Sequence, residues 1–475
     1  MKICVVGTGS TGWLVANYLK LLPYVKKIIV VGSSEIPPIG VGESNTLSLI
    51  PFLRALLDNG DISWDSFIKE TDAAVKYGVY YQDWSKRDFL HHFKCNESWN
   101  SEFDQKHYGR LLANKNPRTH IHEILGKETF NTVKQNLVFL DHYNYLHSYH
   151  FDAAKFINFF SKLALKNDKI EYINTTIIDG EKINDNVNYI IGKDGEKIQA
   201  DYFIFATGDS AINEKFLNIK YQSLEKYLLT DTAIVYPLEY VDKRNQFHPY
   251  TIAKTMKNGW RWITPTWSRI GTGYVFSSKY VSVDKAVNEF LTDIGNHKIT
   301  PSVVNFKPRY NPNPFHKNWS TLGMAQGFLE PLDAPGLTIT IETLIDQLTY
   351  YLSIYNSNLK YNEKMMNIEL EKLNDIIIRR KFDFWCSFIL CQYKTCHRND
   401  TRFWRHHKRV KCEFYDQFMN NLDVYNDTVG NFLFQQTIAS KDIGWKTSLS
   451  SEPYVVNDPI CDKMHHLDYI SQFHK

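Results

Sequence analysis

Long hydrophobic runs are absent from the sequence: no stretch approaches the ~20 consecutive apolar residues that a membrane-spanning helix needs. A signal-peptide pattern is absent as well, because the apolar segment Lys2–Val6 leads directly into glycines. The 7 cysteines are an odd number and lack the spacing of a disulfide framework, which favours free thiols in a reducing compartment. We therefore expect a cytoplasmic protein without membrane contact.

An excess of charge of one sign is also missing. The 55 Lys and Arg residues against 52 Asp and Glu residues leave a formal net charge of +3. That charge is too small for a protein that neutralises a phosphate backbone, so no nucleic-acid partner is expected. With 43% hydrophobic and 23% charged residues, the composition excludes a long disordered chain. The length of 475 residues corresponds to about three domain-sized units.

Sequence motifs typical of metal ligands are also absent. The chain contains no Cys-x-x-Cys pair, and the cysteines and histidines that lie close together have the spacing of one helical segment. These residues are Cys391, Cys396, His397, His406, His407 and Cys412. We expect no metal site.

A glycine loop near the start is the first positive signal. It lies between an apolar strand, Lys2–Val6, and an apolar-faced helix, Trp13–Leu21, with a second strand at Lys27–Val31. Such a loop predicts a dinucleotide site, because glycines let the backbone approach a pyrophosphate and the helix N-terminus offers free N–H groups. The alternative is a glycine turn without a ligand. The residues expected to contact the cofactor are Gly7, Gly9, Ser10, Thr11 and Gly12.

Helix and strand patterns follow one another along the rest of the chain. Helical periodicity covers 45–75, Asp152–Leu165 and Ile341–Tyr425, and hairpin strands are indicated at Tyr77–Trp84 and Phe89–Phe93. The apolar strand Tyr202–Phe205 ends in Ala206-Thr207-Gly208, which is typical of a flavoprotein that closes over the adenosine half of its cofactor. Alternating strands between residues 230 and 280 suggest an antiparallel sheet. No repeat or low-complexity linker separates these parts, so we expect them to interleave.

Several blocks of sequence, in order over most of the chain, match one family. They are Gly12-Trp13-Leu14, Ile39-Gly40-Val41-Gly42-Glu43-Ser44, Lys76-Tyr77-Gly78 with Asp83-Trp84, Gly259-Trp260-Arg261-Trp262-Ile263-Thr264-Pro265, Phe328-Leu329-Glu330-Pro331-Leu332-Asp333 and Arg398-Asn399-Asp400-Thr401-Arg402-Phe403-Trp404. With these blocks the chain resembles the flavin-dependent halogenases, specifically the tryptophan-halogenase-like branch.

The resemblance implies an activity and its cofactors. Reduced FAD (FADH2), supplied by diffusion from a separate flavin reductase, would react with oxygen, and a halide ion would become hypohalous acid. That acid would travel through an internal tunnel to a lysine beside a small aromatic substrate. The lack of a recognisable nicotinamide-docking signature agrees with an external reductase. Further FAD contacts are expected at Gly40, Val41, Gly42, Glu43, Ala206, Gly208 and Gly336.

The catalytic pair implied by the resemblance is Lys76 and Asp333. An ammonium can polarise hypohalous acid through a hydrogen bond, whereas an amine can form a haloamine, and burial shifts a lysine toward either role. The carboxylate would orient the reagent and accept the ring proton. The family usually has Glu at this position, and Asp is one methylene shorter. The alternatives are a solvated strand-edge lysine and an aspartate that caps the next helix.

The Trp-x-Trp block is expected to separate two parts of the site. Trp260 and Trp262 share one face if they lie on a strand. The resemblance gives them, together with Pro265, the role of a tunnel wall that keeps flavin chemistry away from the substrate; a core tryptophan pair is the alternative. The expected substrate contacts are His91, Phe93 and Trp404.

The chain departs from the family pattern at three places. Gly32 stands where an acidic residue would hold the adenosine ribose, so weak FAD binding is expected. Ala334-Pro335-Gly336 replaces Ser-Thr-Gly; the halide contacts then fall on Pro335 and Gly336, only the latter with an N–H, which predicts bromide or iodide over chloride. Gln435-Gln436 lie near the position of a Tyr-Tyr pair that would hold the tryptophan carboxylate, which speaks against free tryptophan as the substrate.

We expect an α/β protein with a flavin-monooxygenase-like FAD-binding fold, an antiparallel substrate-side sheet and a helical C-terminal region. The expected units are residues 1–210 with 320–350 for FAD, 211–319 for the sheet, and 351–475 covering the substrate pocket. The expected function is a two-component halogenase acting on a free electron-rich aromatic. Alternatives are a halogenase of carrier-tethered aromatics, a flavin-dependent aromatic monooxygenase, and a flavin-binding protein that has lost catalysis. A homo-oligomer is possible.

Overall fold

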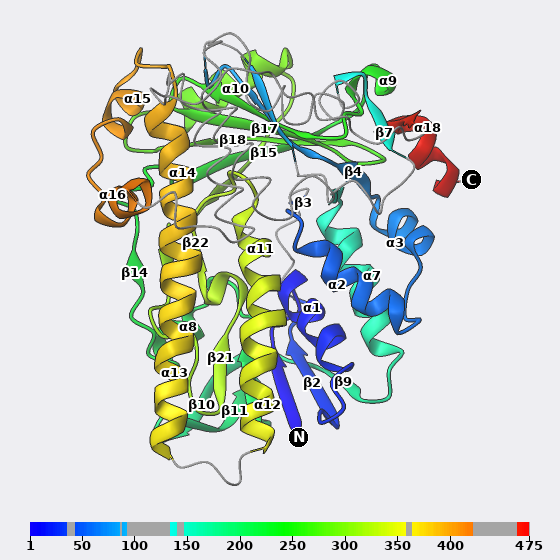
Figure 1. The fold of residues 1–475 in the computed structure, drawn as a ribbon, viewed down its shortest axis with the longest axis vertical. Helices are drawn as coiled ribbons and strands as arrows, with labels where there is room; N and C mark the ends of the chain where they lie inside the picture. The colour runs from blue at the N-terminus through cyan, green and yellow to red at the C-terminus, as the bar shows by residue number, and fades with distance from the viewer. Residues whose placement is uncertain are drawn as a thin grey trace, which may run out of the picture.

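The computed structural model describes residues 1–35, 43–85, 88–92, 134–139, 147–357, 363–420 and 463–474. Within them the chain is an α/β protein, as the sequence predicted, in which two large sheets are joined by long helices (Figure 1). Among these residues no helix combines the length and the hydropathy needed to cross a bilayer.

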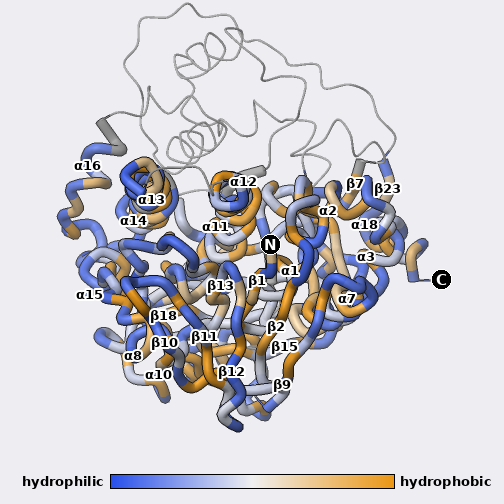
Figure 2. Tube along the Cα trace, turned by 90° about the horizontal axis from the view of Figure 1, so that it is seen from below, coloured by the Kyte–Doolittle hydropathy of each residue, from blue (hydrophilic) through white to orange (hydrophobic). Residues whose placement is uncertain are grey.

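A five-stranded parallel sheet lies near the N-terminus. Its order is β21 (Trp319–Thr321), β13 (Tyr202–Phe205), β1 (Lys2–Val6), β2 (Lys27–Gly32) and β9 (Ile170–Asn174). The apolar runs of β1 and β2, hydrophobic in Figure 2, are buried because helices cover the sheet. Helix α1 (Ser10–Leu19) follows β1 and packs on α7 (Ala153–Leu165), which Asp152 caps. The predicted strand–loop–helix unit and the predicted helix at 152–165 are confirmed.

A seven-stranded sheet forms the other large layer. Its order is β19 (Ser302–Asn305), β15 (Thr232–Leu238), β18 (Ile270–Phe276), β17 (Gly259–Pro265), β16 (Thr251–Met256), β5 (Gly78–Gln82) and β6 (Phe89–His92). All neighbours are antiparallel except β16 and β5, which pair in parallel. The predicted antiparallel sheet and the predicted hairpin are therefore both present, and the hairpin extends the sheet. Helix α10 (Val283–Ile294) covers its outer face (Figure 1).

Smaller elements connect these layers. A three-stranded sheet in the order β3 (Glu43–Ser44), β8 (Ser148–Phe151) and β4 (Ala74–Lys76) carries Lys76 at its end, next to α2 (Leu49–Asp58) and α3 (Trp64–Thr71). The remaining short elements are β10 (Ile177–Ile183), β11 (Asn186–Gly192), β12 (Lys197–Ile198), β14 (Gln222–Ser223), β20 (Arg309–Tyr310), β22 (Gly327–Phe328), α8 (Ala211–Lys215), α9 (Lys243–Gln246) and η2 (Gly323–Ala325).

Two long helical rods run side by side in Figure 1. One comprises α11 (Pro335–Glu342), η3 (Thr343–Leu348) and α12 (Thr349–Ser357); the other comprises α13 (Glu363–Ile377), η4 (Ile378–Asp383) and α14 (Phe384–Thr395). An ion pair of 2.9 Å between Lys381 and Glu342 joins them. With α15 (Arg402–His407) and α16 (Glu413–Asn420), they confirm the helical prediction from Ile341 as far as residue 420.

The segment 463–474 returns to the strand that carries Lys76. It contains β23 (Lys463–His465), which pairs with β7 (Leu137–Phe139), then α18 (His466–Ser471) and η6 (Gln472–His474). The fully buried imidazole of His466 accepts a hydrogen bond of 3.0 Å from the Val75 N–H on β4 and lies 3.0 Å from the Phe247 carbonyl oxygen. This segment therefore satisfies a backbone group at the edge of β4, because an edge strand needs a partner for its free N–H.

Gly273 on β18 makes room for an indole of the neighbouring strand. It pairs with Trp262 across β17 and β18, and a Cβ placed on it would lie 2.1 Å from the Trp262 ring and 2.2 Å from the Ile234 carbonyl oxygen. We predict that Gly273→Ala lowers the free energy of unfolding by about 1–3 kcal/mol, since overpacking forces the ring or the backbone to move. Urea unfolding measures this loss, and near-ultraviolet circular dichroism should report a displaced tryptophan. Wild-type values in both measurements would contradict the packing described here.

Candidate active site

Lys76 ends strand β4 with its side chain buried, 1% of the residue being exposed. Its Nζ donates hydrogen bonds to Ser44 Oγ (2.7 Å) and to the Asn45 carbonyl oxygen (2.9 Å). Burial lowers the pKa of Lys76 to about 8, and the nearby charge of Asp333 opposes that shift. The interpretation as a solvated strand-edge lysine is therefore wrong. A lysine with this pKa can supply either an ammonium or an amine near neutral pH.

Asp333 lies in the tight turn between β22 and α11. Both Asp333 and Ala334 adopt left-handed backbone conformations, with φ of 62° and 56°, at a cost of roughly 1–2 kcal/mol for each non-glycine residue. The N-cap residue of α11 is Ala334, so Asp333 does not occupy the capping position. The buried Asp333 carboxylate instead accepts a hydrogen bond from the hydroxyl of Tyr81 on β5.

Residues Ser44 to Thr46 tie the lysine to the helix that follows Asp333. The Asn45 carbonyl oxygen binds Lys76 Nζ, while Asn45 Oδ1 accepts a hydrogen bond of 3.0 Å from Thr338 Oγ1 on α11. The hydroxyl oxygens of Thr46 and Thr338 lie 2.9 Å apart. Since Lys76 and Asp333 are far apart in sequence, this short segment fixes the distance between the elements that carry them.

The two tryptophans of β17 lie on one face, as predicted. Trp260 and Trp262 are both buried, with ring centroids 6.3 Å apart. The Trp260 indole donates a hydrogen bond of 3.3 Å to Oε1 of Glu330, which also accepts from the hydroxyls of Tyr393 (2.9 Å) and Thr230. Burial raises the pKa of Glu330 to about 7, although these donors oppose the shift. Pro265 ends the same strand.

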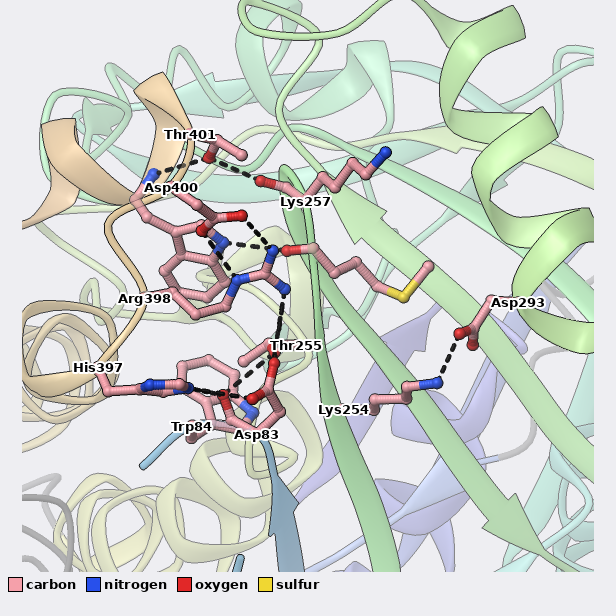
Figure 3. A network of polar contacts seen from close by, with 12 residues as sticks. Asp83, Trp84, Lys254, Thr255, Lys257, Asp293, His397, Arg398, Asp400 and Thr401 are labelled. Carbon is pink, nitrogen blue, oxygen red and sulfur yellow. Dashed lines mark hydrogen bonds and ion pairs between the residues drawn. The ribbon is translucent and has the colours of Figure 1, made fainter. Parts of the chain in front are cut away.

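Two of the matched sequence blocks meet in a polar network (Figure 3). Asp83 accepts hydrogen bonds from Thr255 (2.7 Å) and lies 3.0 Å from His397 Nε2, and Arg398 contacts Thr255 and Asp400. Beside this network Trp404 packs edge-on to Trp84 and donates to the Met256 carbonyl oxygen at 3.0 Å. The network holds residues 397–404 against strand β16. The role of Trp404 as a substrate contact stays a prediction.

The glycine loop has the geometry of a dinucleotide cradle. Gly7 has φ of +128°, and a Cβ on it would lie 2.1 Å from the Ala206 carbonyl oxygen, so β1 and β13 approach closely there. Among the residues that the structure describes, none would lie within 4 Å of a Cβ on Gly9 or on Gly208, so neither glycine is closely packed there. These features fit a pyrophosphate. Ser10 and Thr11 begin α1 and Gly12 continues it.

The end of β2, where a dinucleotide-binding fold usually carries an acidic residue for the ribose, differs in this chain. A Cβ on Gly32 would lie 2.5 Å from the Thr8 side chain, so Thr8 occupies the space that an acidic side chain would need. The Gly32 carbonyl oxygen accepts a hydrogen bond of 3.0 Å from the Tyr172 hydroxyl. No carboxylate is therefore available at position 32 for a ribose hydroxyl.

The structure does not describe the side chains of several predicted site residues. Gly40, Val41, Gly42, Phe93, Gln435 and Gln436 lie outside the described residues, and for Glu43 and His91 only the backbone is described. Pro335 and Gly336 form the first turn of α11. Within the described ranges no three His, Cys, Asp or Glu side chains gather as a metal site would require.

Sequence reasoning missed Tyr81 and Glu330 as members of the site. Tyr81 alternates with Tyr80 on β5 and so faces inward, but no local pattern distinguishes a core tyrosine from one that binds a carboxylate. Glu330 lies within a block that was recognised, and its chemistry became apparent only from the burial and the three donors around it.

Comparisons with known proteins agree on one family. The family model described as tryptophan halogenase matches residues 2–454. Tryptophan 7-halogenase RebH of Lentzea aerocolonigenes is 25% identical over 474 aligned residues, which cover 89% of this chain and 81% of that protein. Tryptophan 6-halogenase ThaL of Streptomyces albogriseolus is 25% identical, with the same coverage of 89% and 81%.

Solved structures are similar over nearly the whole fold. Xcc4156, a flavin-dependent halogenase from Xanthomonas campestris, superposes with a TM-score of 0.78 at 22% identity, covering 92% of this chain and 88% of that one. The tryptophan 6-halogenase SttH from Streptomyces toxytricini gives a TM-score of 0.80 at 20% identity, covering 92% and 90%.

We predict that Tyr81→Phe lowers the free energy of unfolding by about 1.5–3 kcal/mol, the contribution expected of a hydrogen bond to a buried charge. Tyr80→Phe on the same strand is the matched control, because its hydroxyl bonds Asp88 at 3.3 Å on the exposed side; it should change stability by less than about 0.5 kcal/mol. Urea unfolding of both variants provides the measurement. Equal losses would mean that the Tyr81 hydroxyl does not stabilise the Asp333 carboxylate.

Proposed function

The chain belongs to the tryptophan halogenase family, and from that premise we propose that it halogenates a freely diffusing, electron-rich aromatic molecule using FADH2, oxygen and a halide ion. The observation that carries the proposal is the buried Lys76, whose Nζ is held by Ser44 and Asn45 while the Asp333 charge acts on it. Burying an ammonium is costly, and a lysine in this setting can bind hypohalous acid or react with it.

The residues of the glycine loop and of the segment Ala206–Gly208 would hold FAD, with its pyrophosphate at the N-terminus of α1. When bound in reduced form, FAD supplies the oxygen activation that converts halide into hypohalous acid. Thr8 and Gly32 leave the ribose without a carboxylate partner, so we expect loose binding and exchange of the cofactor with a separate reductase.

Lys76 and Asp333 divide the chemistry at the substrate. Lys76 Nζ binds hypohalous acid and aims its halogen at the ring, either through an N–H hydrogen bond or through a nitrogen–halogen bond. Asp333, held by Tyr81, accepts the proton that leaves the ring carbon. Because the Tyr81 hydroxyl binds Oδ2 of the carboxylate, the shorter aspartate is held in place.

Trp260, Trp262 and Pro265 would form the wall between the two chemistries. The rings are packed together and Glu330 anchors the Trp260 indole, so this wall is rigid. A wall that excludes the substrate from the flavin favours halogenation over the alternative of direct aromatic hydroxylation.

The aromatic substrate is proposed to be free rather than carrier-tethered, with His91, Phe93 and Trp404 as candidate contacts. The two relatives RebH and ThaL are named for tryptophan, whereas the unusual Gln435-Gln436 favours a different aromatic here. A panel of free and carrier-linked aromatics with FAD, a flavin reductase and each halide, read by mass spectrometry, tests this choice. Halogenation of carrier-linked aromatics alone would contradict it.

Lys76→Ala should lower the rate of halogenation by at least ~10²-fold, as for other positioned catalytic groups, while oxygen continues to reoxidise the flavin. Lys20→Met is a matched control, because Lys20 is also buried but pairs with Asp61 at 3.2 Å, at a distance from the site. Product formation and flavin reoxidation are measured in parallel. Normal halogenation by Lys76→Ala would exclude the lysine from catalysis.

Bromide and iodide should both be used better than chloride. Pro335 has no N–H, so only the Gly336 amide remains at the turn that would hold the halide. A hydrogen bond to a charged acceptor contributes roughly 1.5–3 kcal/mol, and chloride, the most strongly hydrated of the three, needs such donors most.

The measurement is kcat/KM for each halide at saturating FADH2 with one aromatic substrate, corrected for halogenation by released hypohalous acid. Pro335→Ala restores an N–H and should raise the chloride value relative to bromide. A preference of the wild type for chloride would refute the argument.

A further inference from the structure

A chain of hydrogen bonds leads from Lys76 into the interior. Lys76 Nζ donates to Ser44 Oγ at 2.7 Å, Ser44 Oγ lies 3.4 Å from Thr251 Oγ1, and Thr251 Oγ1 lies 2.8 Å from His150 Nε2. On the far side of the ring, His150 Nδ1 lies 3.0 Å from the Pro265 carbonyl oxygen, at the end of β17. The His150 imidazole is completely buried.

The direction of every bond in this chain follows from its two ends. A carbonyl oxygen only accepts, so Nδ1 of His150 must carry the proton that it donates to Pro265. In the neutral ring Nε2 is then an acceptor, so the Thr251 hydroxyl donates to it. Thr251 can therefore accept only from Ser44, and Ser44 in turn accepts from the lysine ammonium. All donors point from Lys76 toward His150.

The second partner of Lys76 cannot do the same. Asn45 binds Nζ through a backbone carbonyl oxygen, which accepts a hydrogen bond but has no proton to pass on. Of these two branches, the one through Ser44 continues through groups that both donate and accept. A directed row of hydroxyls that ends on an imidazole nitrogen is the arrangement that a proton relay needs.

Rigid elements hold the members of the chain in place. Ser44 on β3 pairs with His150 on β8, and Ala74 on β4 pairs with the same histidine from the other side. Thr251 begins β16, next to the strand β5 that follows Lys76. The relay therefore lies where the lysine-bearing sheet meets the seven-stranded sheet.

Resting on the proposed function, we propose that Ser44, Thr251 and His150 form a proton relay that takes a proton from Lys76 and so converts it into the amine that reacts with hypohalous acid. His150 acts here as a positioning and proton-holding residue, because it does not touch the halogen itself.

The relay step balances in atoms and charge. Nζ–H breaks at Lys76, each hydroxyl receives one proton and passes on another, and an N–H bond forms at His150 Nε2. The positive charge moves from ammonium to imidazolium and no electrons are exchanged. The amine then attacks the halogen of hypohalous acid, which forms a nitrogen–halogen bond and releases water. When the halogen passes to the ring carbon, the ring proton taken up by Asp333 restores the second N–H of the amine. The relay proton then returns by the same path and regenerates the ammonium.

The charges that face the relay keep the proton on Lys76 at rest. Burial, the charge of Lys76 and the neighbouring His466 hold the pKa of His150 well below its usual range, so the ring is neutral and free to accept at neutral pH. Asp333 acts on the lysine end and favours its charged form. When the proton leaves Lys76, the lysine charge no longer opposes protonation of the ring, so the transfer removes part of its own barrier.

The first test is independent of activity. Selective ¹⁵N-histidine labelling of the full chain, with the His150 signal assigned by its loss in His150→Gln, should show a neutral ring protonated at Nδ1 across pH 6–9. Thr251→Val should shift the Nε2 resonance, because it removes the hydroxyl that donates to it. A ring protonated at Nε2, or no shift in the valine variant, would overturn the relay.

The second test separates the lysine step from the oxidation of halide. With bromide and indole as probes, the yield of bromoindole is divided by the yield of hypobromous acid, trapped in parallel with a 1,3-diketone. For the wild type this ratio should level off as the pH falls from 8.5 to 6.5, because proton transfer within the relay does not depend on the bulk pH. In Thr251→Val the lysine must lose its proton to water, so the ratio should fall roughly tenfold per pH unit below the lysine pKa of about 8.

Matched variants distinguish the relay from a structural role. His150→Gln keeps an acceptor for Thr251 but is not a base, and should show the same slope as Thr251→Val, whereas Thr251→Ser should recover most of the lost ratio at pH 6.5. Thr255→Val makes the same change on the same strand at a hydroxyl that bonds Asp83 (Figure 3), and should leave the pH profile unaltered. A flat profile in Thr251→Val would refute the relay. If the wild type makes no hypobromous acid, the proposed function is wrong. The ¹⁵N spectrum of His150 then still tests whether the hydrogen-bond chain has the direction that the relay requires.

Discussion

The amino group of Lys76 is buried in the interior, and much of the surrounding structure compensates for that burial. Removing an ammonium from water costs several kcal/mol after relaxation, so each of its donors needs a partner. Ser44 and Asn45 supply two acceptors and Asp333 supplies the opposite charge. Those partners lie on separate elements. The strained turn at Asp333 and the threonine contacts to α11 hold these elements close to one another.

Each of the two carboxyl groups between β22 and α11 accepts a hydrogen bond from a buried tyrosine. Asp333 receives the hydroxyl of Tyr81, and Glu330 receives that of Tyr393. Both tyrosine rings lie 5.6 Å from the ring of Trp84. One aromatic cluster around Trp84 thus packs against the tyrosines that bind both carboxyl groups. Asp333 would act on the substrate, and Glu330 anchors the proposed tunnel wall.

Patterns that belong to one stretch of chain were readable from the sequence. The glycine loop between strand and helix, the hairpin after Lys76 and the shared face of Trp260 and Trp262 follow from local spacing, and the structure contains all three. The partners of buried polar groups were not readable, because they depend on which strands become neighbours. The parallel pairing of β5 with β16 brings Thr251 near Ser44, and no local sequence pattern in either segment predicts this contact. The same holds for Tyr81, Glu330 and His466.

His466 has a consequence for the order in which the molecule is completed. The ribosome delivers the chain from its N-terminus, so the glycine loop, Lys76 and the whole seven-stranded sheet emerge long before residue 466. Until that histidine arrives, the Val75 N–H beside Lys76 lacks the acceptor that it has in the finished fold. The strand that carries Lys76 therefore gains its last backbone partner near the end of synthesis, after the cofactor cradle has been made.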